Sequence, residues 1–141
     1  DAAGVLGFEM VLACPDGYAP QDDVVARASA KNSRIRLVRD PFDAADGADV
    51  INTDVWASMG QEHEADSRKN VFAPYCVDAK MVDAAAKDVI VMHCLPAHRG
   101  EEITADVLEG KHSVVWDQAE NKLHMHKAIL DVLISGQPGA T

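Results

Sequence analysis

Positive charge is in short supply in this sequence. The 13 Lys and Arg residues stand against 23 Asp and Glu residues, a formal net charge of −10 over 141 residues. Proteins bind nucleic acids and anionic membranes through basic surfaces, so neither is expected as a partner. Long hydrophobic runs are missing too, because none approaches the roughly 18 apolar residues of a membrane-spanning helix. The length is that of one domain able to bury a core.

Cysteine is scarce, and so are glycine-rich loops. The three cysteines, Cys14, Cys76 and Cys94, cannot all pair, and each lies in an apolar stretch. Reduced thiols are the simpler interpretation, which predicts a cytoplasmic protein, or one of the mitochondrial or plastid matrix in a eukaryote. The glycine-rich fingerprint that holds the phosphates of a dinucleotide is absent, which counts against a nucleotide-binding module.

What the sequence does contain is a regular alternation of short apolar runs with helical patterns. The runs are continuously apolar, as is typical of strands buried on both faces. They predict strands at Phe8–Cys14, Ile35–Arg39, Val50–Thr53, Val89–His93 and Ser113–Trp116. Helices are predicted over Asp22–Lys31, after N-caps at Asp78 and at Thr104 (the latter ending at Gly110), and over about Gln118–Ile134, with Leu123, Leu130 and Ile134 as a core stripe.

This alternation predicts an α/β fold, a doubly wound, Rossmann-like parallel sheet with helices on both faces. Residues 1–134 are expected to form one domain and residues 135–141 a flexible tail. The opening "DAAGVLGF" has the pattern of a helix ending at Gly7, without the strand that normally precedes it. The sheet is therefore expected to lack its first, central strand. The strands at 8–14 and 50–53 would then be unpaired with each other and about 10 Å apart.

In such sheets ligands bind at the carboxyl ends of the strands. The segment "VIVMHCLPAHRGEE" ends an apolar strand with His93 and Cys94, and the strand at 50–53 ends at Asp54. Because these strands are expected to be neighbours, Asp54 and Cys94 should lie within a few ångström of each other. Taken singly, each of these residues has an ordinary explanation: a capping aspartate, a small buried thiol, a packed histidine.

Other polar residues carry less information. His98, Arg99, Glu101 and Glu102 are most simply a solvated loop. His124 and His126 are two residues apart on a helix and point in different directions, whereas a zinc-binding pair prefers a spacing of four. No metal site is therefore expected.

Three segments together resemble a known family. "DVWASMG", "HCLPAHRGEEIT" and "WDQAENKLH", in this order and spacing, resemble the carbamoyltransferases, and within them the ornithine carbamoyltransferases. The resemblance runs from about residue 7 to residue 133 and covers the ornithine-binding, C-terminal domain only. It implies a complete enzyme with a second, carbamoyl-phosphate-binding domain, assembled as a homotrimer, with no metal or organic cofactor.

The resemblance also implies roles for individual residues. Asp54 matches the acid that holds the α-amino group of L-ornithine. Cys94 and Leu95 match the strand end at the reacting carbamoyl group, where the thiol lies between the acid and the side-chain amine. The expected substrate-binding residues are Asp54, Ser58, Met59, His93, Cys94, Leu95 and Lys122, with Asp54 and Cys94 catalytic. The implied reaction carries the carbamoyl group of carbamoyl phosphate to the δ-amine of L-ornithine, giving L-citrulline and phosphate.

The sequence departs from the family pattern in two respects. The Ser-x-Arg-Thr and His-Pro-x-Gln motifs of the other domain are absent, as is the asparagine that binds the ornithine carboxylate. In addition, "AENK" places Lys122 where the family usually has arginine. Lysine keeps the charge and loses the two-pronged hydrogen bonding of the guanidinium group.

Three other interpretations stay open on the sequence alone. One is a related carbamoyltransferase that uses putrescine or a modified ornithine. Another is a non-catalytic interaction or regulatory domain derived from the enzyme. The third, the nucleotide-binding module, is disfavoured by the missing glycine-rich fingerprint.

Overall fold

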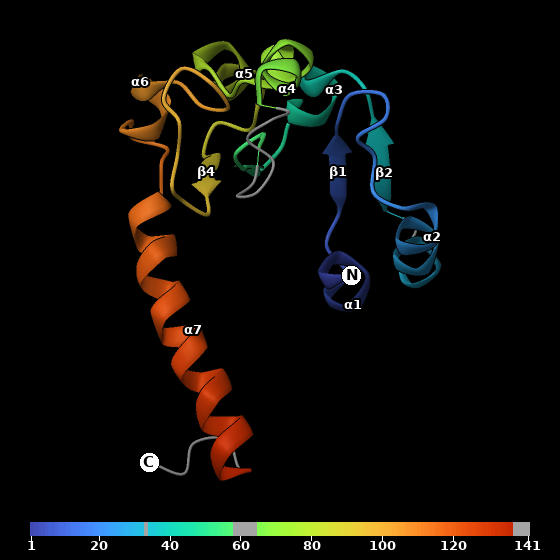
Figure 1. Ribbon diagram of the computed structural model, residues 1–141, viewed down its shortest axis with the longest axis vertical. Coiled ribbons are helices and arrows are strands. Elements are labelled where there is room, and N and C mark those ends of the chain that lie inside the picture. The colour runs from blue at the N-terminus through green and yellow to red at the C-terminus, as the bar shows by residue number, and fades with distance from the viewer. Residues whose placement is uncertain (33, 58–64, 137–141) are drawn as a thin grey trace.

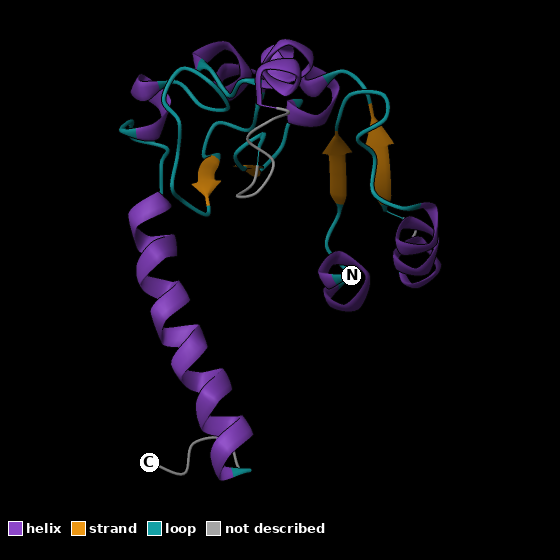
Figure 2. Ribbon diagram, viewed as in Figure 1, coloured by secondary structure: helices purple, strands orange, loops and turns teal. Residues whose placement is uncertain are grey.

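The computed structural model describes residues 1–32, 34–57 and 65–136. Helices and strands alternate from α1 to β3 as the sequence predicts, and more than one helical segment then follows each of β3 and β4 (Figures 1 and 2). The elements are α1 (Ala2–Leu6), β1 (Met10–Ala13), α2 (Asp22–Lys31), β2 (Ile35–Val38), α3 (Pro41–Ala45), β3 (Val50–Thr53), α4 (Ala65–Phe72), the 3-10 turn η2 (Ala73–Tyr75), α5 (Ala79–Ala84), β4 (Ile90–His93), α6 (Ala105–Leu108) and α7 (Val115–Ser135).

The strands form two parallel pairs. β1 pairs with β2, and β3 pairs with β4 in a register that sets Thr53 opposite His93. Within the described residues no hydrogen-bonded ladder joins β1 to β3, as expected for a sheet without its central strand. A cavity of about 460 Å³ is lined by residues of both strands, including Val11 and Ile51. The separation of about 10 Å stays a prediction.

The predicted strand at Ser113–Trp116 is wrong. Ser113 makes a single parallel bridge to Val91, and helix α7 begins two residues later. The chain holds the edge of β4 through two backbone hydrogen bonds, from Val91 N to His112 O and from Val114 N to Val91 O. It then turns into the helix with Val115 fully buried. The apolar run therefore anchors the start of a helix in the core.

The core gathers around β3 and β4. Its members are the buried apolar side chains of these strands and of the helices and loops packed on them: Ala45, Ile51, Val77, Met81, Val89, Val91, Ile103, Val107, Leu108 and Val115. No residue of β1 or β2 belongs to this cluster, although Val50 of β3 and Ile90 of β4 are exposed, as Met10 and Leu37 are. The ends of β3 and β4 thus lie beside the main core.

Capping accounts for several of the helix boundaries. Asp78 accepts a hydrogen bond from the backbone of Met81 at 2.9 Å, which confirms it as the N-cap of α5. Thr104 is the N-cap of α6 by position, without a side-chain capping bond. That helix ends at Leu108 rather than running to Gly110, where an added Cβ would meet Asp106 O at 2.5 Å. At the other end of the chain, α1 ends at Gly7 as predicted, in the left-handed region at φ 77°.

Helix α7 extends away from the rest of the molecule (Figure 1). The expected core stripe on it is wrong for this chain, because Leu123, Leu130 and Ile134 are 59%, 56% and 83% exposed. Other apolar residues around the helix, such as Met125 and Leu133, are exposed as well. A helix with a broad apolar face normally packs that face against another surface.

The described part of the chain has no helix long and apolar enough to cross a membrane. The predicted limit of the domain at residue 134 falls one residue before the end of α7, which Gly136 terminates. Residues 137–141 lie outside the described residues, so the flexible tail stays a prediction.

Candidate active site

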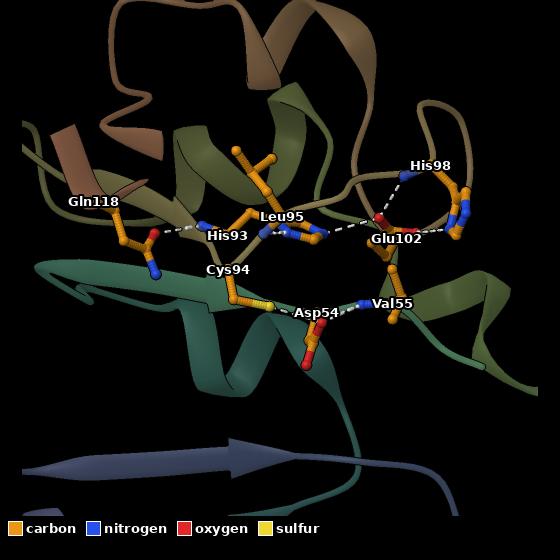
Figure 3. Close-up of polar contacts among 8 residues, drawn as sticks. All are labelled: Asp54, Val55, His93, Cys94, Leu95, His98, Glu102 and Gln118. Atoms are coloured by element: carbon orange, nitrogen blue, oxygen red, sulfur yellow. Dashed lines mark hydrogen bonds and ion pairs between the residues drawn. The ribbon is translucent and has the colours of Figure 1, made fainter. Parts of the chain in front are cut away.

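Asp54 and Cys94 leave the same edge of the sheet, because each follows one of the paired residues Thr53 and His93. The Cys94 thiol donates a hydrogen bond to Asp54 Oδ1, with Sγ and Oδ1 2.9 Å apart (Figure 3). The same carboxylate oxygen accepts from the backbone N–H of Val55 at 2.8 Å, which fixes its direction. The expected proximity of the two side chains is confirmed.

The Cys94 thiol is kept neutral by its surroundings. Desolvation raises its pKa, and the hydrogen bond to Asp54 and the negative charge of Asp54 raise it further, whereas Lys122 lowers it. A raised pKa means less thiolate at neutral pH, and the thiolate is the nucleophilic form. The geometry therefore suits Cys94 for hydrogen bonding and positioning.

Helix α7 contributes two polar side chains to the same strand end. Lys122 Nζ donates to the carbonyl oxygen of Cys94 at 2.8 Å, and Gln118 Oε1 accepts from the backbone N–H of His93 at 2.9 Å. The two residues are four apart, so they lie on one face of the helix. Because Val115 anchors the start of α7 in the core, this face is held against β4.

His93 is buried, and both of its ring nitrogens are engaged. Nε2 is 2.9 Å from Glu102 Oε1, and Nδ1 accepts from the backbone N–H of Leu95 at 2.8 Å. Leu95 has a φ of 56°, in the left-handed region that leucine rarely adopts, and precedes a cis peptide bond to Pro96. The expectation of a solvated loop is wrong for Glu102, which is 0% exposed.

The structure adds two residues that the sequence did not single out, Glu102 and Gln118. Both fall within segments that carry the family resemblance, "HCLPAHRGEEIT" and "WDQAENKLH", but neither was assigned a role from the sequence. Ser58 and Met59, predicted to contact substrate, lie outside the described residues.

Two groups of side chains bring possible metal ligands close together. In each of the groups Asp54, His93, Cys94 and His98, Glu101, Glu102, the ligand atoms lie within 4.8 Å of one another. In the first group the thiol already donates to the carboxylate, and His93 would have to give up an existing hydrogen bond to bind an ion. These contacts favour hydrogen bonding over coordination at that site.

A carboxylate, a neutral thiol and an ammonium group thus meet at the ends of two parallel strands. Residues 1–133 match the family profile of the aspartate/ornithine carbamoyltransferases, in their Asp/Orn binding domain. The chain belongs to this family. The match covers almost the whole chain and confirms the resemblance predicted from its motifs.

Several relatives are closely similar. The ornithine carbamoyltransferase of Desulfotalea psychrophila is 61% identical over 131 residues, which cover 92% of this chain and 43% of that protein. The anabolic ornithine carbamoyltransferase of Pseudomonas aeruginosa is 54% identical over 134 residues, which cover 95% of this chain and 43% of that protein. The solved structure of ornithine carbamoyltransferase from Pyrococcus furiosus superposes with a TM-score of 0.88 at 48% identity, covering 96% of this chain and 45% of that one.

The chain therefore spans less than half the length of these relatives. The structural match confirms the predicted α/β fold class. Asp54 and Cys94 both lie within the matched segment, residues 1–133.

Proposed function

We propose that this chain is the ornithine-binding half of a carbamoyltransferase that converts L-ornithine and carbamoyl phosphate to L-citrulline and phosphate, as in arginine biosynthesis. The hydrogen-bonded pair of Asp54 and Cys94 carries the proposal, together with Lys122, which donates to the carbonyl oxygen of Cys94. The carboxylate supplies the negative charge that an α-ammonium group requires. The neutral thiol supplies a hydrogen-bonding group that does not compete as a nucleophile.

The proposed reaction needs no cofactor. The neutral δ-amine of ornithine attacks the carbonyl carbon of carbamoyl phosphate, forming a tetrahedral intermediate and a new C–N bond. The intermediate collapses by breaking the C–O bond to phosphate, and the amine loses a proton. The protein contributes by holding two substrates in line and by stabilising the developing charge.

The remaining site residues take positions around this reaction. The carbonyl oxygen of Cys94 accepts from Lys122 and has a second lone pair for the NH2 of the carbamoyl group, while the N–H of the same peptide group is held by His93 Nδ1. Lys122 places a positive charge beside it. Ser58 and Met59 are proposed to contact the amino acid, as the resemblance implies.

The exposed apolar surface of α7 supports a second domain. Leu123, Leu130 and Ile134 are more than half exposed, and the chain spans 43% of its relative from Desulfotalea psychrophila. We infer that a carbamoyl-phosphate-binding domain covers this helix and supplies the phosphate-binding motifs. The complete enzyme is proposed to be a homotrimer assembled mainly through that domain, and to act in the cytoplasm or an organelle matrix.

A chimera tests the proposed function. Residues 1–133 replace the matching segment of the Desulfotalea psychrophila enzyme, and citrulline formation is measured against the parent protein. We expect turnover with L-ornithine and little or none with putrescine or N-acetylornithine. A folded chimera that is inactive on ornithine beside an active parent would contradict the proposal. Preference for putrescine or N-acetylornithine would keep the family and change the substrate.

A further inference from the structure

The peptide group between Cys94 and Leu95 is held at both ends. Its carbonyl oxygen accepts from Lys122 Nζ at 2.8 Å, and its N–H donates to His93 Nδ1 at 2.8 Å. The C=O and N–H of a trans peptide lie in one plane and point in opposite directions. Holding the N–H on His93 therefore fixes the direction of the Cys94 carbonyl.

This arrangement also supports an unfavourable backbone conformation. Leu95 has a φ of 56°, where the side chain of an L-amino acid is crowded by its own backbone. The hydrogen bond from its N–H to His93 opposes relaxation of this residue to an ordinary conformation. The orientation of the peptide group thus depends on the state of the His93 ring.

The hydrogen bonds define that state. A backbone N–H only donates, so His93 Nδ1 must present a lone pair to Leu95. The neutral ring then carries its proton on Nε2, which lies 2.9 Å from Glu102 Oε1. In the other tautomer, Nδ1–H would face the N–H of Leu95, and the lone pair of Nε2 would face the carboxylate.

Glu102 is placed to select this tautomer. It is 0% exposed, and its Oε1 also accepts from the backbone N–H of His98 at 2.7 Å, which aims the carboxylate at the ring (Figure 3). A carboxylate that only accepts hydrogen bonds favours the Nε2–H form of a neighbouring histidine. Its second oxygen, Oε2, has no hydrogen-bond partner within the described residues.

We propose that Glu102 is a positioning residue, which selects the Nε2–H tautomer of His93 and thereby orients the Cys94–Leu95 peptide group toward the carbamoyl group. The inference rests on the proposed function, because the oriented carbonyl matters for catalysis only if this strand end meets the reacting group. Glu102 itself touches no reacting atom.

The tautomer is measured by ¹⁵N NMR of the histidine rings in the 141-residue chain, in which protonated and unprotonated ring nitrogens resonate far apart. We expect Nε2–H for His93 in the unaltered chain and in Glu102→Gln, whose amide oxygen still accepts. Glu102→Leu, of similar size and without an acceptor, should lose the single tautomer. Glu101→Gln is the control. Glu101 is the half-buried neighbour of Glu102 in the sequence, and it pairs with Lys69 and not with His93.

Kinetics in the chimera test the consequence for catalysis. Glu102→Leu should lower kcat about 10- to 100-fold, as expected for a misplaced reacting group, with KM for ornithine changed less than about threefold. Glu102→Gln should restore most of kcat, and Glu101→Gln should leave it unchanged. If Glu102 only holds the loop together, kcat and KM will follow thermal stability and not the tautomer.

A pair of His93 variants keeps the test decisive if Glu102→Leu fails to fold. His93→Asn offers an oxygen near the position of Nδ1, and His93→Gln offers an amide near that of Nε2. Orientation of the peptide group predicts that the asparagine variant retains more kcat. A higher kcat for the glutamine variant, or Nδ1–H in the unaltered chain, would overturn the proposal. An inactive unaltered chimera would instead defeat the proposed function, while the NMR result still decides the tautomer.

Discussion

Cys94 Sγ and Asp54 Oδ1 lie 2.9 Å apart although the two residues are 40 positions apart in the sequence. The contact follows from the register of β3 and β4. This register sets Thr53 and His93, which directly precede Asp54 and Cys94, opposite each other. A thiol that donates to a carboxylate stays protonated, so this pair offers one negative charge and one neutral hydrogen-bonding group. That combination binds an ammonium group without adding a reactive thiolate.

Alkylation of Cys94 should be slow at neutral pH. Burial and Asp54 raise its pKa, so the thiolate is scarce below the folded pKa and its fraction rises tenfold per pH unit toward it. Asp54→Asn removes the negative charge, lowers the pKa and should speed alkylation by iodoacetamide at pH 7.5. Peptide mass spectrometry of the 141-residue chain separates Cys94 from Cys14 and Cys76. A faster reaction with Asp54 present than with asparagine would contradict the account.

The charge of Lys122 should matter more than its shape in this chain. Lys122→Met removes the hydrogen bond to the Cys94 carbonyl and a positive charge that lowers the pKa of the thiol. In the chimera we expect kcat to fall about tenfold, the effect of one charge-assisted hydrogen bond of about 1.5 kcal/mol. Lys122→Arg should keep activity within about threefold, because it retains the charge. Equal losses in both variants would mean that lysine geometry is required.

The N-cap of α5 offers a stability test away from the site. Asp78→Ala removes the acceptor for the Met81 N–H, and the free energy of unfolding should fall by about 1 kcal/mol in urea titrations of the chain. Asp83→Ala, an exposed residue within the same helix, should change it by less than about 0.5 kcal/mol. Equal effects at the two positions would show that the cap contributes nothing specific.

The isolated 141-residue chain should form no citrulline, because the phosphate-binding motifs of the family are absent from it. Light scattering should show at most weak trimer formation, since the proposed trimer is held mainly through the other domain. Appreciable turnover by the purified chain, or a tight trimer, would contradict the division of labour between two domains.

Much of the fold could be predicted because its signals are local. Four apolar runs became β1 to β4. Asp78 begins α5 and Gly7 ends α1, as their residue types indicate. The run at Ser113–Trp116 was misassigned because one buried residue, Val115, anchors a helix there, and a short apolar run has no periodicity that distinguishes the two. The stripe on α7 has a helical period, but periodicity alone does not identify the surface that covers it.

The site could be predicted only in part for the same reason. Strand ends place Asp54 and Cys94, since parallel neighbours share an edge. Glu102 could not be recognised, because its burial depends on the loop after β4 folding back onto His93. Gln118 needed α7 to begin earlier than its pattern indicates.

The measurement that tests the central claim most directly is the ornithine dependence of the chimera with Asp54→Asn. The variant leaves an ammonium group without its counter-charge, so kcat/KM for ornithine should fall about 10- to 150-fold, as expected for a hydrogen bond to a charged group of about 1.5–3 kcal/mol. Asp49→Asn, at the opposite end of the same strand, is the matched control and should change it less than about twofold. Cys94→Ser should be milder than Asp54→Asn. Unchanged kcat/KM for ornithine in Asp54→Asn would contradict the claim that this strand end binds the amino acid.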